Sequence, residues 1–217
     1  MNDSRLIGRT LWFYRKAWIS LMTGIILCTG ILTGALIVGD SVRGSLADLA
    51  RLRLGKTRWA IRPGNHFLRA ALAAELASEI KTPVIPALLR DGVGVNVING
   101  LRTGSLNVIG IDSGFTTLWD DIVPLPGSDE AVISRNLAEK LALRTGDPLL
   151  VRIPNTGSAP QNAPFVSESA PTVSWRLTVS AITDDRRMGR FSLRNDQKAP
   201  LNIFVSLPQM AGRLEIN

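Results

Sequence analysis

Residue types that commonly carry out catalysis or bind metals are scarce in this 217-residue chain. Its only histidine is His66 and its only cysteine is Cys28, so neither a Cys/His zinc site nor a disulfide within the chain can be assembled. The tripeptide Gly55-Lys56-Thr57 matches the end of a phosphate-binding loop, but the first glycine of that motif would fall at Ala50, inside a helical pattern. We therefore expect Gly55 to end a helix and Lys56 to face solvent.

Ser41 is the residue that most invites assignment as a nucleophile, because Gly39-Asp40-Ser41 matches the opening motif of one group of lipase-like hydrolases. A serine nucleophile needs a neighbouring base. His66 is the only histidine available, and Pro63 stands where such enzymes place an aspartate three residues before it. We expect Asp40 and Ser41 to mark the point where a helix enters water, and His66 to face solvent.

Three acidic pairs could bind a metal or exchange protons. They are Asp120-Asp121, Asp129-Glu130 and Asp184-Asp185. All three lie in predicted loops, where solvation by water is the simpler role. The residues therefore predict no enzyme activity, no metal site and no cofactor.

The charge distribution bears on the class of partner. The chain has 25 Lys and Arg against 18 Asp and Glu, a formal net charge of +7, with 45% apolar and 20% charged residues. Such a composition is typical of a folded protein. The basic residues are spread widely along the chain, so we expect no nucleic-acid partner.

The longest apolar segment is residues 17–39, which carry no charged side chain and are bounded by Lys16 and Asp40. About 20 apolar residues in a helix cross a hydrocarbon core of about 30 Å. A cleaved signal peptide has a shorter apolar region of about 7–15 residues, and a buried helix of a globular protein normally keeps a polar face. The segment predicts a transmembrane helix, with these two as the alternatives.

The residues flanking this segment predict its orientation. Arg5, Arg9, Arg15 and Lys16 precede it, whereas Arg43 alone follows within the next ten residues. This bias places residues 1–16, a basic and aromatic segment, in the cytoplasm. Residues 40–217 would then be periplasmic, on a chain anchored in a bacterial inner membrane.

Gly30 and Gly34 lie four residues apart within the span. Small residues at this spacing allow the backbones of two membrane helices to approach closely. We therefore expect Gly30 and Gly34 to pack against partner helices.

Residues 40–55 continue the helical pattern, with Val42, Leu46 and Leu49 on one side. No proline interrupts the pattern before Gly55, which predicts one helix of about 38 residues and about 57 Å, with residues 40–55 as a stalk. Residues 56–217 alternate between strand and helix patterns, which predicts an α+β domain.

The elements expected in this domain follow from periodicity, turn residues and caps. We expect strands at 57–62, 93–98, 106–111, 131–133, 149–153, 173–183 and 201–205, helices at 67–80 (capped by Asn65), 134–141 (capped by Ser134) and 208–214, a hairpin turn at Asn99-Gly100, and a long loop at 154–172.

Three segments carry a resemblance to a known family. They are VGDSVRGSLADLARLRLG at 38–55, EAVISRNLAEKLALRTGDPLLVRI at 130–153 and GRFSLRNDQKAPLNIFVSLPQM at 189–210. Following a basic, aromatic N-terminus and one span, they resemble the N-terminal part of an FtsX-like ABC transporter permease. This group includes the MacB efflux permease and the lipoprotein-release permeases.

The resemblance implies a MacB-like periplasmic core domain between the first span and a later block of three spans. It also implies a separate ABC ATPase that docks on cytoplasmic loops of that block and whose hydrolysis cycle moves the stalk and the core. We expect this chain to be a fragment of such a permease, with membrane lipid, the ATPase and further permease helices as partners, and a homodimer among the assemblies to consider.

The residues taken alone leave another function open. A single span, a stalk and a domain without catalytic residues also suit a single-pass sensor or adaptor whose extracytoplasmic domain binds a ligand or a protein. A membrane-anchored envelope enzyme is disfavoured, because no pair of nucleophile and base is visible.

Overall fold

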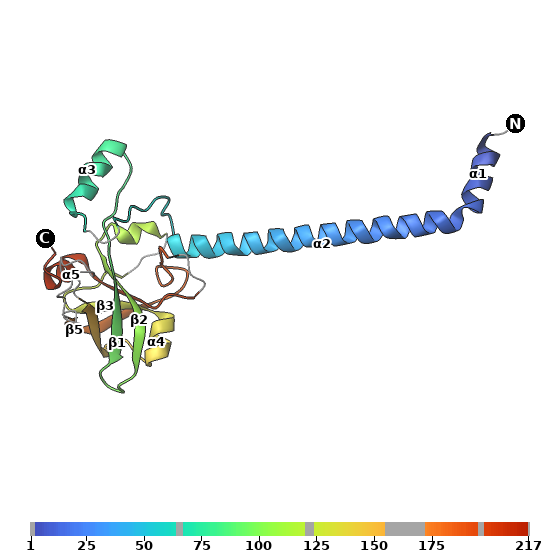
Figure 1. The fold of residues 1–217 in the computed structure, drawn as a ribbon. Coiled ribbons are helices and arrows are strands. Elements are labelled where there is room, and N and C mark those ends of the chain that lie inside the picture. The colour runs from blue at the N-terminus through green and yellow to red at the C-terminus, as the bar shows by residue number, and fades with distance from the viewer. Residues whose placement is uncertain (1–2, 64–66, 120–123, 155–171, 195–197, 217) are drawn as a thin grey trace, which may run out of the picture. The chain divides into compact units, whose positions relative to one another are not determined.

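The computed structural model describes residues 3–63, 67–119, 124–154, 172–194 and 198–216 (Figure 1). The chain divides into two compact units, Met1–Leu49 and Ala50–Asn217. Each unit is described by itself below.

The first unit is helical. Helix α1 runs from Asp3 to Phe13, and α2 begins at Arg15 and continues to Leu54, so its last turn belongs to the second unit. None of the 40 residues of α2 is buried. Thr23 and Thr29 donate their hydroxyl hydrogens to the carbonyls of Ile19 and Ile25, at 2.8 and 2.7 Å, which satisfies these polar groups within the helix.

The predicted long helix is confirmed, beginning two residues earlier than the apolar segment. By length and composition, α2 is the one helix of the described residues able to cross a membrane. The apolar residues of 17–39 and the absence of proline explain both its length and its exposure.

The second unit is a mixed helix and strand domain, as expected. Its helices are α3 (Ala71–Ile80), the 3₁₀ helix η1 (Phe115–Leu118), α4 (Arg135–Leu141) and α5 (Leu207–Arg213). Its strands are β1 (Leu88–Asn96), β2 (Arg102–Ile111), β3 (Glu130–Ser134), β4 (Pro148–Pro154), β5 (Thr172–Thr183) and β6 (Asn202–Ser206).

The six strands close into a barrel in the order β1-β2-β6-β3-β5-β4, which the sequence analysis did not foresee. The pairs β2–β6 and β3–β5 are parallel, and the other four pairs are antiparallel. Strand β6 therefore lies between β2 and β3, far from both in sequence. A closed barrel leaves no strand edge exposed.

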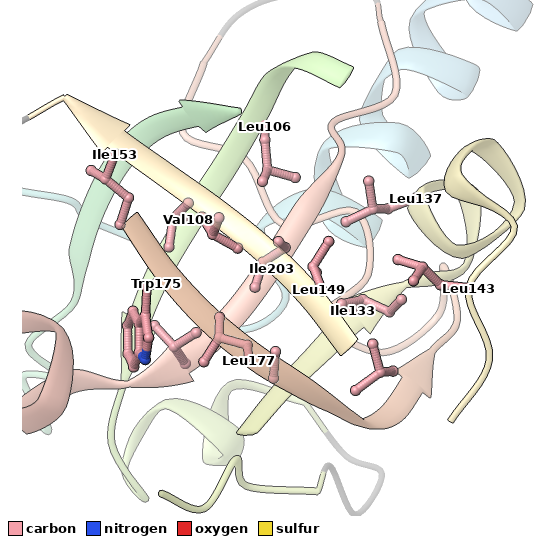
Figure 2. Packing of buried hydrophobic residues seen from close by; sticks show 14 of the residues in the cluster. Leu106, Val108, Ile133, Leu137, Leu143, Leu149, Ile153, Trp175, Leu177 and Ile203 are labelled. Atoms are coloured by element: carbon pink, nitrogen blue, oxygen red, sulfur yellow. The ribbon is translucent and has the colours of Figure 1, made fainter. Parts of the chain in front are cut away.

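Two apolar clusters lie on opposite sides of the barrel wall. On β6, Ile203 and Val205 belong to one cluster, and Phe204 between them belongs to the other. All strands except β1 contribute fully buried side chains to the first cluster, which fills the barrel interior. Figure 2 shows Leu149, Leu177 and Ile203 converging there. The second cluster covers the outer side of β2, β3 and β6.

The hairpin prediction is confirmed, with longer strands than expected. Gly100 has φ +71°, and Asn99 Oδ1 accepts the N–H of Leu101 at 2.9 Å. The remaining strand predictions from 131–133 onward are confirmed as β3 to β6, and the last helix as α5. Residues 155–171 of the predicted long loop lie outside the described residues.

Three predictions were wrong in detail. Residues 57–62 form no strand, because no strand pairs with them among the described residues. Helix α3 begins at Ala71 and not at 67, and Asn65 lies outside the described residues. Ser134 does occupy the N-cap position of α4, but its hydroxyl oxygen accepts the N–H of Asn202 at 3.1 Å and makes no cap bond.

Candidate functional site

The acidic residues that could have formed a catalytic or metal site have other roles in the structure. Asp184 Oδ1 accepts the backbone N–H groups of Arg186 and Arg187, each at 3.2 Å, which stabilises a turn. Glu130 Oε2 accepts the N–H of Gly127 at 3.0 Å. Among the described residues, no group of three His, Cys, Asp or Glu side chains could hold a metal ion. Asp120 and Asp121 lie outside that set, as does His66.

Asp129 is held by an aromatic and a basic partner. Its Oδ1 accepts hydrogen bonds from the Trp175 indole N–H at 2.8 Å and from Arg213 Nη2 at 3.0 Å. The Trp175 hydrogen bond and, less strongly, the Arg213 charge lower the pKa of Asp129, although desolvation acts in the opposite direction. The Arg213 guanidinium also lies 5.1 Å from the Trp175 ring centroid. This cluster fixes α5 to β5.

A shallow hollow of about 310 Å³ lies beside Asp91, Gly92 and Arg152. The Asp91 carboxylate accepts a hydrogen bond from Arg194 Nη2 at 2.6 Å, so its charge already has a partner within the chain. Specific small-molecule sites bring several polar groups together at one point. This hollow has no such convergence, and we do not assign it a ligand.

Gly30 and Gly34 lie in α2 as predicted, and both are exposed. A Cβ atom added at either position would meet nothing within 4 Å. Backbone at both positions is therefore open to close approach by another helix. Their role in helix packing stays a prediction.

The most distinctive arrangement in the second unit is the joint where the last turn of α2 meets the barrel domain. We use "joint" for Arg53, Gly55, Lys56, Leu118 and Trp119. Gly55 ends the helix with φ +55° and donates its N–H to Arg51 O at 2.9 Å, as predicted for a helix-ending glycine. The N–H of Lys56 then bonds to Leu118 O at 2.9 Å.

The joint leaves no room for a side chain at residue 55. A Cβ atom there would lie 2.6 Å from Leu118 O and 3.0 Å from Trp119 Cε2. Both the left-handed conformation and the close approach therefore require glycine. The Gly-Lys-Thr tripeptide serves as an attachment to η1 and not as a phosphate loop.

Trp119 connects the joint to the outer cluster. Its ring centroid lies 5.4 Å from that of Phe115 and 5.9 Å from that of Phe191. Phe115 in turn lies 6.2 Å from Phe204 of β6. A continuous chain of aromatic contacts thus runs from Trp119, which lies beside Gly55, to Phe204 of β6 in the barrel wall.

A second attachment lies nearby in sequence. Arg53 Nη2 donates a hydrogen bond to Lys198 O at 3.0 Å, in the segment that leads into β6. The end of α2 is therefore fixed at η1 and again just before β6. Two attachment points resist rotation about the helix end better than one.

Sequence reasoning found Gly55 but missed Trp119. The four-residue spacing of Phe115 and Trp119 on an aromatic-poor chain was the available signal, but nothing local relates Trp119 to Gly55. No family model and no curated protein matches this sequence.

Proposed function

We propose that this chain is a membrane-anchored part of an ABC transporter permease, in which ATP hydrolysis by a separate subunit is coupled to movement of the barrel domain. One observation carries the proposal. The helix that contains the apolar segment is also the element fixed to the barrel domain by Gly55, Trp119 and Arg53. A displacement of that helix end is passed to η1 and β6 by packed groups.

The composition of α2 supports the same role. No proline or turn interrupts it between Arg15 and Leu54, and a regular hydrogen-bond ladder makes a helix stiff along its axis. Gly30 and Gly34 would allow partner helices to contact it closely. In this proposal the motion originates in those helices, and the chain supplies no chemistry of its own.

We infer that the chain lies in a bacterial inner membrane with residues 1–16 in the cytoplasm and the barrel domain in the periplasm. The basic flank of the span supports this orientation. Alkaline phosphatase fused after residue 217 should be active, and a fluorescent protein that matures only in the cytoplasm should stay dark there. The reverse pattern would invert the topology.

The coupling itself can be tested in the intact permease with its ATPase, reconstituted in proteoliposomes. An environment-sensitive fluorophore on a cysteine at exposed Glu139, in a Cys28→Ser background, should report an ATP-dependent change. Leu46→Pro should abolish that change, because an interior proline breaks the helical ladder and costs about 3 kcal/mol. Leu46→Ala is the matched control and should keep the signal. A full signal from the proline variant would contradict the coupling.

A further inference from the structure

The segment that joins α2 to α3 combines positive charge with exposed apolar side chains. We call residues 56–63, the part of this segment next to α2, the connecting segment. It contains Lys56, Arg58 and Arg62 and no acidic residue. It has no regular secondary structure beyond the turn at Lys56. This segment therefore carries three of the chain's 25 basic residues with no acidic residue beside them, in a chain whose net charge is +7.

The apolar residues of the connecting segment are exposed to an unusual extent. Trp59 is 91% exposed and Ile61 is 73% exposed, whereas Trp119 is 8% and Trp175 is 1% exposed. Large aromatic side chains normally bury most of their surface. Trp59 and Ile61 therefore present an apolar surface that the described part of the chain does not cover.

The order of residues separates the two kinds of side chain. In an extended chain, successive side chains point to opposite faces. Arg58 and Arg62 then alternate with Trp59 and Ile61, which is the pattern that led to the wrong strand prediction. Because no strand among the described residues pairs with this segment, the face with Trp59 and Ile61 is free to contact something outside the described chain.

We propose that the connecting segment binds the surface of a bilayer that contains anionic phospholipids. The Trp59 and Ile61 side chains would enter the interfacial region, and Arg58 and Arg62 would contact lipid phosphates. Tryptophan favours this region because its ring is apolar and its N–H is polar. Guanidinium groups bind phosphate oxygens in a bidentate manner.

A lipid surface fits better than a protein or nucleic-acid partner for a reason of proximity. The same chain carries a candidate membrane span that ends at Gly39, so a bilayer is present at high effective concentration. Two weak signals, an apolar anchor and a basic cluster, are together sufficient for stable surface binding.

The chain lengths allow this contact. Residues 40–54 of α2 extend about 22 Å as a helix. If the helix tilts by up to about 40°, its end lies about 17 Å above the hydrocarbon core. The headgroup layer occupies about 5–7 Å of this height, which leaves about 10–12 Å for the chain to span. Gly55 and Lys56 form the turn of the joint, so the chain can extend only from Thr57 onward, and Thr57 to Ile61 then spans up to about 14 Å. The proposal therefore requires a tilted α2.

The test uses the full chain in nanodiscs, with the fluorophore NBD on cysteine in Ile61→Cys/Cys28→Ser. Discs of phosphatidylcholine alone are compared with discs that contain about one third phosphatidylglycerol. We expect NBD emission to rise and shift to the blue only in the anionic discs. The same label in Glu139→Cys/Cys28→Ser, on α4, should report no difference.

Charge variants give the matched comparison. Arg58→Gln/Arg62→Gln should lower the docking equilibrium about thirtyfold, since each basic residue near an anionic surface contributes about fivefold. Arg135→Gln/Lys140→Gln removes two exposed charges from α4 and should leave the signal unchanged. Equal emission in both disc types, or equal loss in both charge variants, would overturn the proposal. An NBD emission that rises with the number of chains per disc would overturn the proposal, because it would show that the label is buried by self-association of the chain.

This proposal needs the membrane anchor but not the ATPase. Co-elution of the chain with the discs tests the anchor separately. An anchored chain with an unchanged label would overturn the surface contact alone and leave the proposed coupling intact.

Discussion

Leu32 of α2 and Leu149 of β4 are the same residue type in opposite surroundings. The Leu32 side chain is 60% exposed, whereas Leu149 is fully buried in the barrel interior. The contrast extends to both regions as a whole, since α2 has no buried residue and the barrel has two apolar clusters. The barrel domain covers its own apolar surface. Helix α2 does not, and its sequence is suited to a bilayer or to other helices.

The two regions also differ in how they satisfy polar groups. In α2, threonine hydroxyls bond to carbonyls four residues earlier in the same helix. In the barrel, the Nδ2 group of buried Asn202 donates to Gly189 O at 3.0 Å and to Phe191 O at 2.8 Å. The Oδ1 atom of Asn202 accepts a hydrogen bond from Asn107 Nδ2 at 3.1 Å. Local bonds make a helix independent of its partners, whereas long-range bonds make a barrel cooperative.

Truncating the two leucines should give the largest difference between the regions. We expect Leu149→Ala to lower the free energy of unfolding of the barrel domain by about 2–5 kcal/mol, because it leaves a cavity in a closed interior. Leu32→Ala should change it by less than about 0.5 kcal/mol. Urea unfolding in detergent, followed by tryptophan fluorescence, measures both. Equal effects would mean that α2 and the barrel unfold as one unit.

Removing long-range hydrogen bonds should have the next largest effect. Asn202→Ala leaves the buried carbonyls of Gly189 and Phe191 without a donor, which should destabilise the barrel by about 1–3 kcal/mol. Thr29→Ala removes only a bond within α2 and should leave the barrel unchanged. The same urea titration checks this. A stable Asn202→Ala variant would show that the Asn202 hydrogen bonds do not hold the 189–191 segment in place.

Alanine substitution at two glycines compares the joint, at Gly55, with the middle of α2, at Gly44. Gly55→Ala should destabilise the domain by about 1–2 kcal/mol, because φ is +55° and the new Cβ would meet Leu118 O. Gly44→Ala meets nothing within 4 Å and should be neutral or stabilise the helix by up to about 1 kcal/mol. Circular dichroism and urea unfolding distinguish them. A tolerated Gly55→Ala would contradict the geometry of the joint.

The smallest effect concerns pH. Because the folded pKa of Asp129 is lowered, its carboxylate stabilises the domain fully above its unfolded pKa of about 3.9, and this contribution is lost as pH falls through the folded pKa. Asp129→Asn should therefore be less stable than the native chain at pH 7, and the difference should shrink below about pH 4. Urea midpoints at pH 7, 5 and 3 measure it. A constant difference across this range would exclude the carboxylate charge as its source.

Local sequence signals accounted for most of the elements. Alternation along 173–183, Asn99-Gly100 and the uncharged run of 17–39 each act within a few residues, and β5, the hairpin and α2 follow from them. Residues 57–62 have the same kind of alternation, yet they form no strand. A strand needs a partner, and the sequence does not say whether one exists.

The barrel and the joint could not be predicted for the same reason. The parallel pairing of Asn107 with Asn202, and the approach of Trp119 to Gly55, join residues far apart in sequence. Ser134 illustrates the point at one residue. Its position was predicted to cap α4, but its hydroxyl bonds to the backbone of β6.

The place of β6 between β2 and β3 has a consequence for biosynthesis. Both neighbouring strands are synthesised well before Asn202, so each keeps an unpaired edge until β6 is made. At about 5–20 residues per second this interval is on the order of 10 s. Unpaired edges promote aggregation. The domain should thus depend on holding chaperones, in the compartment where it folds, until β6 is available to pair with β2 and β3.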